Sequence, residues 1–184
     1  MTRDILWDIH PYIGVADLTF GMRQATVAEF LGPAVAVTFA KDIPFLEPED
    51  YEGLYTHEEG RAFSGAEYMK TMPTVAYLDD RAVSFTFFDV HETLNVGGIF
   101  LFKGVPGQNI LRLKEVSQCV IRSDEGSCFF MDFGINVLDE DLFDFSDGVT
   151  VFSKGQYDRF ILAGLRRGSC QYLKGDSNAL EKYL

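Results

Sequence analysis

Few residues of this sequence combine a type and a spacing that could carry out catalysis. The tripeptide Asp132-Phe133-Gly134 matches the magnesium-binding motif of protein kinases. A kinase also needs a Gly-rich loop, a strand lysine and a catalytic-loop Asp, which this chain of 184 residues lacks. No G-x-S-x-G, H-E-x-x-H, phosphate-binding loop or dinucleotide-binding glycine pattern occurs either. The motifs therefore predict that the protein is not an enzyme and uses no cofactor.

Three histidines and three cysteines are the other groups that could bind a metal or act on a substrate. They are His10, His57, His91, Cys119, Cys128 and Cys170. No two histidines stand four residues apart and no cysteines form a C-x-x-C pair, so the spacing predicts no metal site. The run His57-Glu58-Glu59 could hold a cation, although acids beside glycines are usually a solvated loop. Apolar neighbours of the cysteines, such as Phe129 beside Cys128, favour buried thiols over nucleophiles.

Carboxylates are the groups that the sequence concentrates. Segment 132–147 holds six acidic residues and no basic one, interleaved with Leu142, Phe143 and Phe145, and segment 42–72 holds a second acidic run. Aromatic rings among carboxylates favour protein recognition, because the rings supply buried area and the acids supply specificity and association rate. The alternative is a solvated turn whose apolar side chains enter the core. The predicted partner-binding residues are Glu47, Glu49, Asp50, Tyr51, Glu52, Tyr55, Glu58, Glu59, Asp139, Glu140, Asp141, Phe143 and Asp144.

The overall charge narrows the class of partner. With 28 acidic and 16 basic residues, the chain has a net charge of −12, which repels nucleic acid and anionic lipid. A basic protein would be steered toward it. Asp4 and Asp8 interrupt the apolar run that a signal peptide needs, and the odd cysteine number without C-x-x-C spacing indicates a reducing compartment. We therefore expect a cytoplasmic protein that binds neither nucleic acid nor membrane.

The first half of the chain contains one clear helix signal. An amphipathic stretch predicts a helix over about 22–31, and Gly32-Pro33 provides the residues that end it. We expect this helix to bury Val27, Phe30 and Leu31. After it, residues 34–40 predict a strand and residues 42–72 an acidic loop with one turn of helix. The runs 74–78 and 82–87, on either side of a short polar turn, predict a β-hairpin.

The second half repeats this plan. Gly104, Val105, Ile110 and Leu113 stand 83 residues after Gly21, Met22, Val27 and Phe30. Three strand candidates follow at 127–131, 135–138 and 149–152, and a closing helix over 157–165 ends near Gly168. The sequence therefore predicts an α+β fold: a single domain, 1–184, built of two tandem α+β repeats, about 1–90 and 91–184, with antiparallel sheets.

The first repeat carries a recognisable signature. Its residues are Gly14, Leu18, Phe20, Gly21, Met22, Val27, Leu31, Gly32 and Pro33. The pattern resembles small bacterial proteins with a Gly-Met, helix, Leu-Gly-x-Pro unit, many of them immunity proteins of polymorphic toxin systems, and the second copy from Val96 to Tyr157 fits the same template. A shorter version is similar to the repeat of outer-membrane assembly lipoproteins and of β-lactamase inhibitor protein. The lipidated N-terminal cysteine of the lipoproteins is missing here.

The resemblance implies a non-enzymatic inhibitor and no catalytic residues. Together with the charge, it leads to the hypothesis of a cytoplasmic immunity protein that binds a cognate toxin with a basic cleft and occludes its active site with carboxylates. Two other hypotheses stay open. A structural or regulatory interaction module would present an apolar patch and no charged face, and an uncharacterised hydrolase would bring His57 or His91 together with acids in a pocket.

Overall fold

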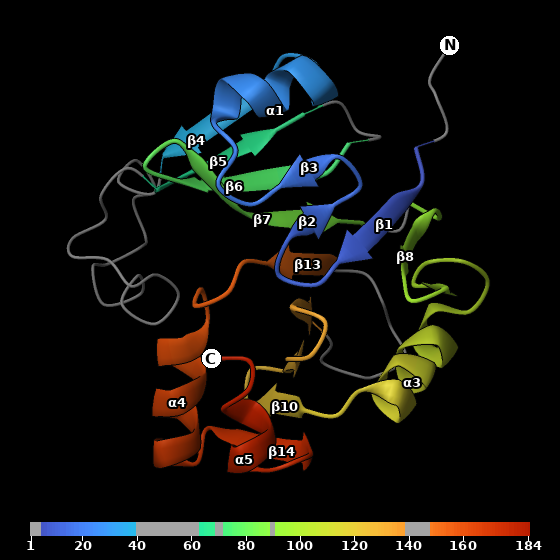
Figure 1. Cartoon of the computed structure of the whole chain (residues 1–184), viewed down its shortest axis with the longest axis vertical. Helices are drawn as coiled ribbons and strands as arrows, with labels where there is room; N and C mark the ends of the chain where they lie inside the picture. The colour runs from blue at the N-terminus through green and yellow to red at the C-terminus, as the bar shows by residue number, and fades with distance from the viewer. Residues whose placement is uncertain (1–4, 40–62, 69–71, 89–90, 139–147) are drawn as a thin grey trace.

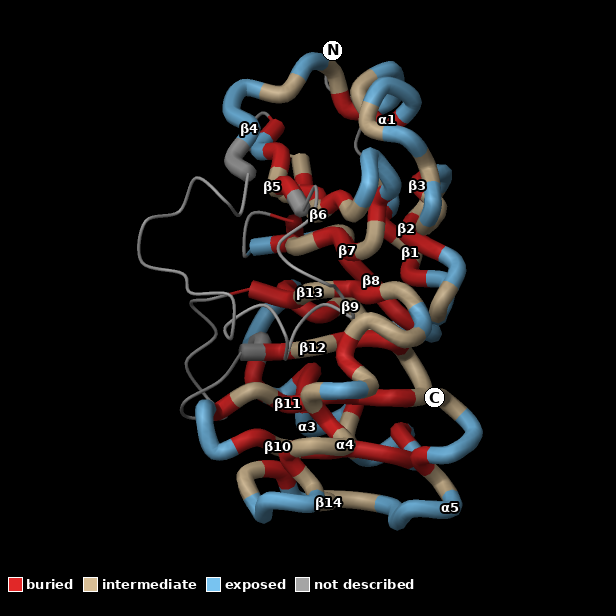
Figure 2. Tube along the Cα trace, turned by 90° about the vertical axis from the view of Figure 1, so that its left-hand side faces the viewer, coloured by how far each residue is buried: buried red, intermediate tan, exposed pale blue. Residues whose placement is uncertain are grey.

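A nine-stranded antiparallel sheet extends along the length of the molecule (Figures 1 and 2). The computed structural model describes residues 5–39, 63–68, 72–88, 91–138 and 148–184. The strand order is β14-β10-β11-β12-β13-β7-β6-β5-β4. In chain order these strands are β4 (Ala36–Phe39), β5 (Phe63–Glu67), β6 (Thr74–Leu78), β7 (Arg81–Phe87), β10 (Val120–Ser123), β11 (Ser127–Phe130), β12 (Ile135–Leu138), β13 (Val149–Phe152) and β14 (Cys170–Lys174).

The large sheet consists of two four-stranded meanders that meet at one seam. Strands β4 to β7 pair in chain order, and so do β10 to β13. The last strands of the two meanders, β7 and β13, pair antiparallel, with Phe87 opposite Val149 and Phe85 opposite Val151. All four of these side chains are buried, so the seam lies in the core.

A smaller five-stranded sheet lies beside the large one. Its order is β3-β2-β1-β8-β9, and β1 and β8 form its single parallel pair. The strands are β1 (Trp7–His10), β2 (Gly14–Val15), β3 (Leu18–Thr19), β8 (Leu94–Val96) and β9 (Ile99–Phe100). Strands β8 and β9 are joined by Gly97 and Gly98, both with positive φ, as a tight type I′ hairpin turn requires.

Four described helices accompany the sheets. They are α1 (Gln24–Leu31), α3 (Pro106–Val116), α4 (Asp158–Arg167) and α5 (Ser177–Leu180). Helices and two mostly antiparallel sheets make a mixed α+β fold, which confirms the predicted fold class. Figure 1 shows α3 and α4 on opposite sides of the lower half of the molecule, with α1 at the top.

Two hydrophobic clusters occupy the two faces of the large sheet. On β11, Cys128 and Phe130 belong to the larger cluster, whereas Phe129 belongs to the smaller one. Successive strand residues point to opposite faces, so the clusters lie on opposite sides of the sheet. The larger cluster runs from β5 to β10 and includes buried residues of α1 and α3. The smaller cluster, under α4 and α5, contains residues of β10, β11, β13 and β14.

Close backbone contact fixes α4 on β14. A Cβ atom at Gly164 would lie 2.3 Å from the Cys170 Sγ, so only glycine fits at this crossing. The helix ends at Gly168, whose φ of 81° gives the left-handed conformation predicted for its C-terminus. The predicted closing helix is thereby confirmed, two residues longer than expected at its C-terminal end.

Most predicted elements of both halves are confirmed. The helix predicted over 22–31 is α1, ended by Gly32 with φ 92°, and the β-hairpin is formed by β6 and β7. Asp79 and Asp80 form its turn, both with positive φ. In the second half, the helix that follows Gly104 is α3, and the three strand candidates are β11, β12 and β13.

Two expectations for the first half are wrong. Phe30 is 38% exposed: Val27 and Leu31 face the core, while Phe30 makes only an edge contact with the Trp7 ring at 6.5 Å between centroids. The segment 42–72, expected as a loop with one turn of helix, contains the strand β5. Its sequence, Phe-Ser-Gly-Ala-Glu, lacks the β-branched residues of a strand, but β4 and β6 pair with it on both sides.

Candidate functional site

The predicted partner-binding residues all lie outside the residues that the structure describes. They are Glu47, Glu49, Asp50, Tyr51, Glu52, Tyr55, Glu58, Glu59, Asp139, Glu140, Asp141, Phe143 and Asp144. His57 is outside them as well. Within the described residues, the site therefore has to be sought on the surfaces that flank these two acidic segments.

The described strands show where the two acidic segments are attached. Segment 40–62 connects β4 to β5, and segment 139–147 connects β12 to β13. Neighbouring strands between β12 and β4 alternate in direction, so β12 and β4 run opposite ways. The two segments are therefore attached at opposite ends of the strands.

Charge is unevenly distributed along the chain. The described residues hold fourteen acidic and twelve basic residues, whereas the remaining positions hold fourteen acidic and only four basic ones. Twelve of these fourteen acids are in segments 40–62 and 139–147. The negative charge that would attract a basic partner thus comes almost entirely from two short segments of sequence.

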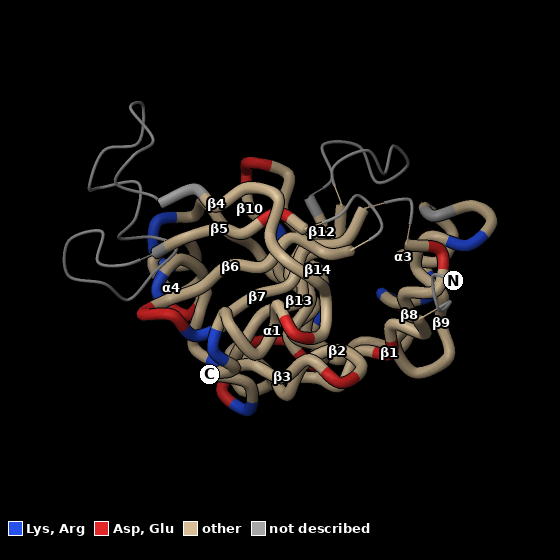
Figure 3. The backbone as a smooth tube through the Cα atoms, turned by 90° about the horizontal axis from the view of Figure 1, so that it is seen from above, with Lys and Arg blue, Asp and Glu red and all other residues tan. Residues whose placement is uncertain are grey.

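The outer side of α4 has the opposite charge. Arg159, Arg166 and Arg167 are exposed on it, and Lys154 is exposed just before the helix (Figure 3). Residues seven and eight positions apart lie on one helix face, so the arginines form a basic stripe. None of them forms an ion pair with another described residue. A basic partner would be repelled from this side and attracted toward other surfaces.

One face of the large sheet is polar where no described helix covers it. A line of paired residues crosses five strands there: Asn136 (β12), Thr150 (β13), Thr86 (β7), Thr74 (β6) and Glu67 (β5). Glu67 follows Ala66, which pairs with Val75, and it therefore lies opposite Thr74. We call these five residues the polar row. Strand spacing gives the row a length of about 19 Å.

The polar row lies on the same face of the sheet as α4, and only one end of the row lies next to this helix. The Asn136 side chain lies close enough to Tyr157, the residue that precedes α4, to affect its pKa, and Tyr157 belongs to the smaller hydrophobic cluster. Burial raises the pKa of Tyr157, and the Asn136 side chain acts in the opposite direction. Further along, Thr86 and Thr150 are partly exposed with their hydroxyl oxygens 3.0 Å apart, and Glu67 is exposed. The row thus runs from the edge of α4 into solvent.

Residues with small side chains lie beside the polar row, so no bulky group projects from the sheet there. Ser84, Ala76 and Gly65 form a second line across β7, β6 and β5. A Cβ atom at Gly65 would meet nothing within 4 Å, although its φ is not in the left-handed region. The fold would therefore tolerate a larger side chain at position 65. Because Gly65 has no side chain, the sheet backbone is less covered at this point.

Two acceptor atoms at the α4 edge have no donor. Asn136 Oδ1 and Gln156 Oε1 are buried and make no hydrogen bond. Gln156 directly precedes Tyr157, and its backbone N–H donates to the Ser153 carbonyl. A buried acceptor without a donor costs about 1–3 kcal/mol.

The kinase-like tripeptide has a structural role. Asp132 accepts hydrogen bonds from the Ser117 hydroxyl and, at 3.0 Å, from the Gln118 backbone N–H. These residues directly follow α3, so the carboxylate orders the turn between α3 and β10. Gly134 allows the close approach of Tyr12, whose hydroxyl donates to the Met131 carbonyl.

The three thiols are buried, and so is His91. Cys119, Cys128 and Cys170 are buried free thiols, as predicted for Cys128 from its apolar context. Burial, with a smaller effect of the Asp132 charge, raises the pKa of Cys119 to about 11, which opposes formation of a thiolate. His91 is buried between the rings of Trp7 and Phe87, and its Nδ1 lies 3.0 Å from the Phe88 carbonyl oxygen.

Metal sites, membrane-spanning helices and known relatives were the remaining indications of function. Among the described residues, no three His, Cys, Asp or Glu side chains form a group that could hold a metal ion. In the same part of the chain, no helix has the length and apolar character needed to cross a membrane. Comparisons with protein-family models, curated proteins and solved structures gave no match. Function must therefore be inferred from the chain itself.

Proposed function

We propose that the protein is an immunity protein, a non-catalytic inhibitor that binds a cognate bacterial toxin and occludes its active site. The observation that carries this proposal is a polar, partly exposed sheet face in a chain of net charge −12. An inhibitor needs a rigid surface of roughly 800 Å² per partner, and adjacent strands of one sheet provide such a surface.

The charge distribution specifies the chemistry of the partner. A toxin with a basic cleft would be attracted to the acidic segments 40–62 and 139–147 and repelled by the arginines of α4. A surface that combines attractive and repulsive charges orients the partner before contact. This orientation raises the association rate, while buried contacts determine how long the complex lasts.

The two meanders support the tandem-repeat hypothesis within this proposal. In each half, a hairpin of short strands precedes a helix, and a four-stranded meander follows it. The first half has β2, β3, α1 and β4–β7, and the second has β8, β9, α3 and β10–β13. The exposed Phe30 weakens the match, because its counterpart Leu113 is fully buried. If the halves are copies, joining them at β7 and β13 doubles the width of the binding surface.

A growth assay tests the proposed function. The proteins encoded by the genes directly beside this one are expressed singly in a bacterial host, with and without this protein. We expect one of them to arrest growth and coexpression to restore it, because immunity genes lie next to toxin genes. If none of the neighbouring products is toxic, or if a toxic one stays toxic on coexpression, the proposal is wrong.

Charge-reversal variants then test which segments contact the toxin. Glu49, Asp50 and Glu52 are changed to Lys in one variant, and Asp139, Glu140 and Asp141 in another. We expect at least one triple variant to lose protection. Arg166→Glu with Arg167→Glu is the opposite-sign control on α4 and should protect fully. If both triple variants protect and associate at unchanged rates in low salt, the acidic segments are not the contact.

A further inference from the structure

We infer that the polar row is the place where an extended Lys- or Arg-bearing segment of the toxin docks. This inference rests on the proposed function and names the contact surface among the described residues. The side chains of the polar row offer hydrogen-bond acceptors, and none of them carries a positive charge. Glu67 supplies an exposed carboxylate, and none of the described residues forms an ion pair with it.

The other end of the row requires a donor. Asn136 Oδ1 is buried and receives no hydrogen bond from the part of the chain that the structure describes. The threonine hydroxyls between the two ends can each accept a further hydrogen bond. Ammonium and guanidinium groups have donors only, three and five respectively, so they match this row better than any neutral or acidic side chain.

The geometry favours an extended segment rather than a single side chain. The row measures about 19 Å from Asn136 to Glu67, the length of about six residues in extended conformation. Ser84, Ala76 and Gly65 beside it place no large side chain in the way. A basic segment laid along the row can therefore reach Glu67 with one cationic group, while another approaches the Asn136 end of the row.

Binding of the toxin identified by the growth assay tests this inference with two variants. Glu67→Lys reverses the charge of the row at an exposed position, and Asn136→Ala removes the unpaired acceptor. The matched control is Glu29→Lys, which makes the same charge change on α1, the helix packed against the opposite face of the sheet. We expect Glu67→Lys to weaken binding about tenfold or more, Asn136→Ala to weaken it several-fold, and Glu29→Lys to leave Kd within about twofold.

Methyl NMR spectra of the full chain give a second readout that does not depend on variants. The threonine methyl signals of Thr74, Thr86 and Thr150 should shift when toxin is added. Those of Thr26 on α1 and Thr93, whose hydroxyl donates to the Ile5 carbonyl, should not. If the toxin binds wild-type protein while Glu67→Lys binds equally well and the three signals stay in place, this inference is wrong and the proposed function stands. If no neighbouring product binds at all, the proposed function itself fails.

Discussion

The hydroxyl oxygens of Thr86 and Thr150 lie 3.0 Å apart across the seam that joins the two four-stranded meanders. Among the described strands, β7 and β13 form the pair that joins the two meanders. The buried Phe85 and Phe87 lie beneath this seam on the other face, with Val149 and Val151. The same two threonines form the centre of the polar row. The seam thus links the stability of the sheet to the proposed binding surface.

A double-mutant cycle at the seam should detect this hydrogen bond. Thr86→Val or Thr150→Val alone should lower the free energy of unfolding by about 1 kcal/mol, because each leaves one hydroxyl without its partner. The double variant should lose less than the sum, by about 0.5 kcal/mol or more. Urea unfolding, followed by the fluorescence of the single tryptophan, Trp7, measures all three. Simple additivity would show that the two hydroxyls do not interact.

Phe30 and Phe87 should differ strongly in their contribution to stability. Both rings contact Trp7 edge-on, but Phe30 is 38% exposed and Phe87 is fully buried. Phe87→Ala should cost about 3–5 kcal/mol because it leaves a cavity. Phe30→Ala should cost about 1 kcal/mol, the value of an edge contact with partial burial. Thermal unfolding of the two variants checks this. Equal losses would place Phe30 in the core, as the sequence had indicated.

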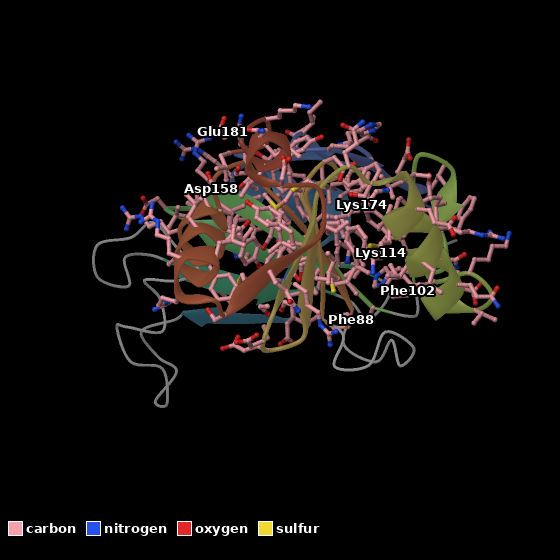
Figure 4. The ribbon with its side chains drawn as sticks, turned by 90° about the horizontal axis from the view of Figure 1, so that it is seen from below. Phe88, Phe102, Lys114, Asp158, Lys174 and Glu181 are labelled. Atoms are coloured by element: carbon pink, nitrogen blue, oxygen red, sulfur yellow. The ribbon has the colours of Figure 1, made fainter. Side chains whose placement is uncertain are left out.

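Lys174 should stabilise the protein through the end of α3. Its Nζ donates to the carbonyls of Lys114 at 3.1 Å and Glu115 at 2.6 Å, in the last turn of the helix (Figure 4). A cation there satisfies free carbonyls and the helix dipole, so Lys174→Met should cost about 1–2 kcal/mol. Lys182→Met, at an exposed position in the same C-terminal region, should change stability by less than about 0.5 kcal/mol. Equal effects in chemical denaturation would contradict this role.

The protein should lose stability at alkaline pH. Burial raises the pKa of Tyr12, Tyr68 and Tyr77 above the usual 10, and that of Cys119 to about 11. When the folded-state pKa lies above the unfolded one, the unfolded state loses its proton first, and the stability contribution disappears as pH rises. The free energy of unfolding should therefore fall progressively above about pH 9. An unchanged urea midpoint between neutral pH and pH 11 would contradict the burial of these groups.

The sequence predicted elements well where the signal was local. Amphipathic spacing and a terminal glycine located α1, a closing glycine located the end of α4, and strand-like runs bounded by turn residues located β6, β7, β12 and β13. Elements that depend on distant partners were missed. Strand β5 exists because β4 and β6 pair with it, and the first turn of α1 receives its hydrogen-bond acceptor from Asp80 at 3.2 Å, in the hairpin turn of β6 and β7. Nothing near Gln24 in the sequence could show this.

The candidate site was harder to predict than the fold. The acidic segments stand out in composition, but the polar row does not, because Glu67, Thr74, Thr86, Asn136 and Thr150 are scattered over 84 positions. Only the register of five strands brings them into line. Alternation within β6 and β7 could have shown that their threonines point away from the core, yet not which strands are neighbours.

Inhibition of the toxin at a defined stoichiometry tests the central claim most directly. The purified product of the toxic neighbouring gene is assayed for its own activity while this protein is added in increasing amounts. An inhibitor that occludes the active site with nanomolar or tighter affinity should reduce the activity linearly to zero at one equivalent. Raising the salt concentration should slow the onset of inhibition without changing this end point. A toxin that stays fully active with excess protein present would contradict the account.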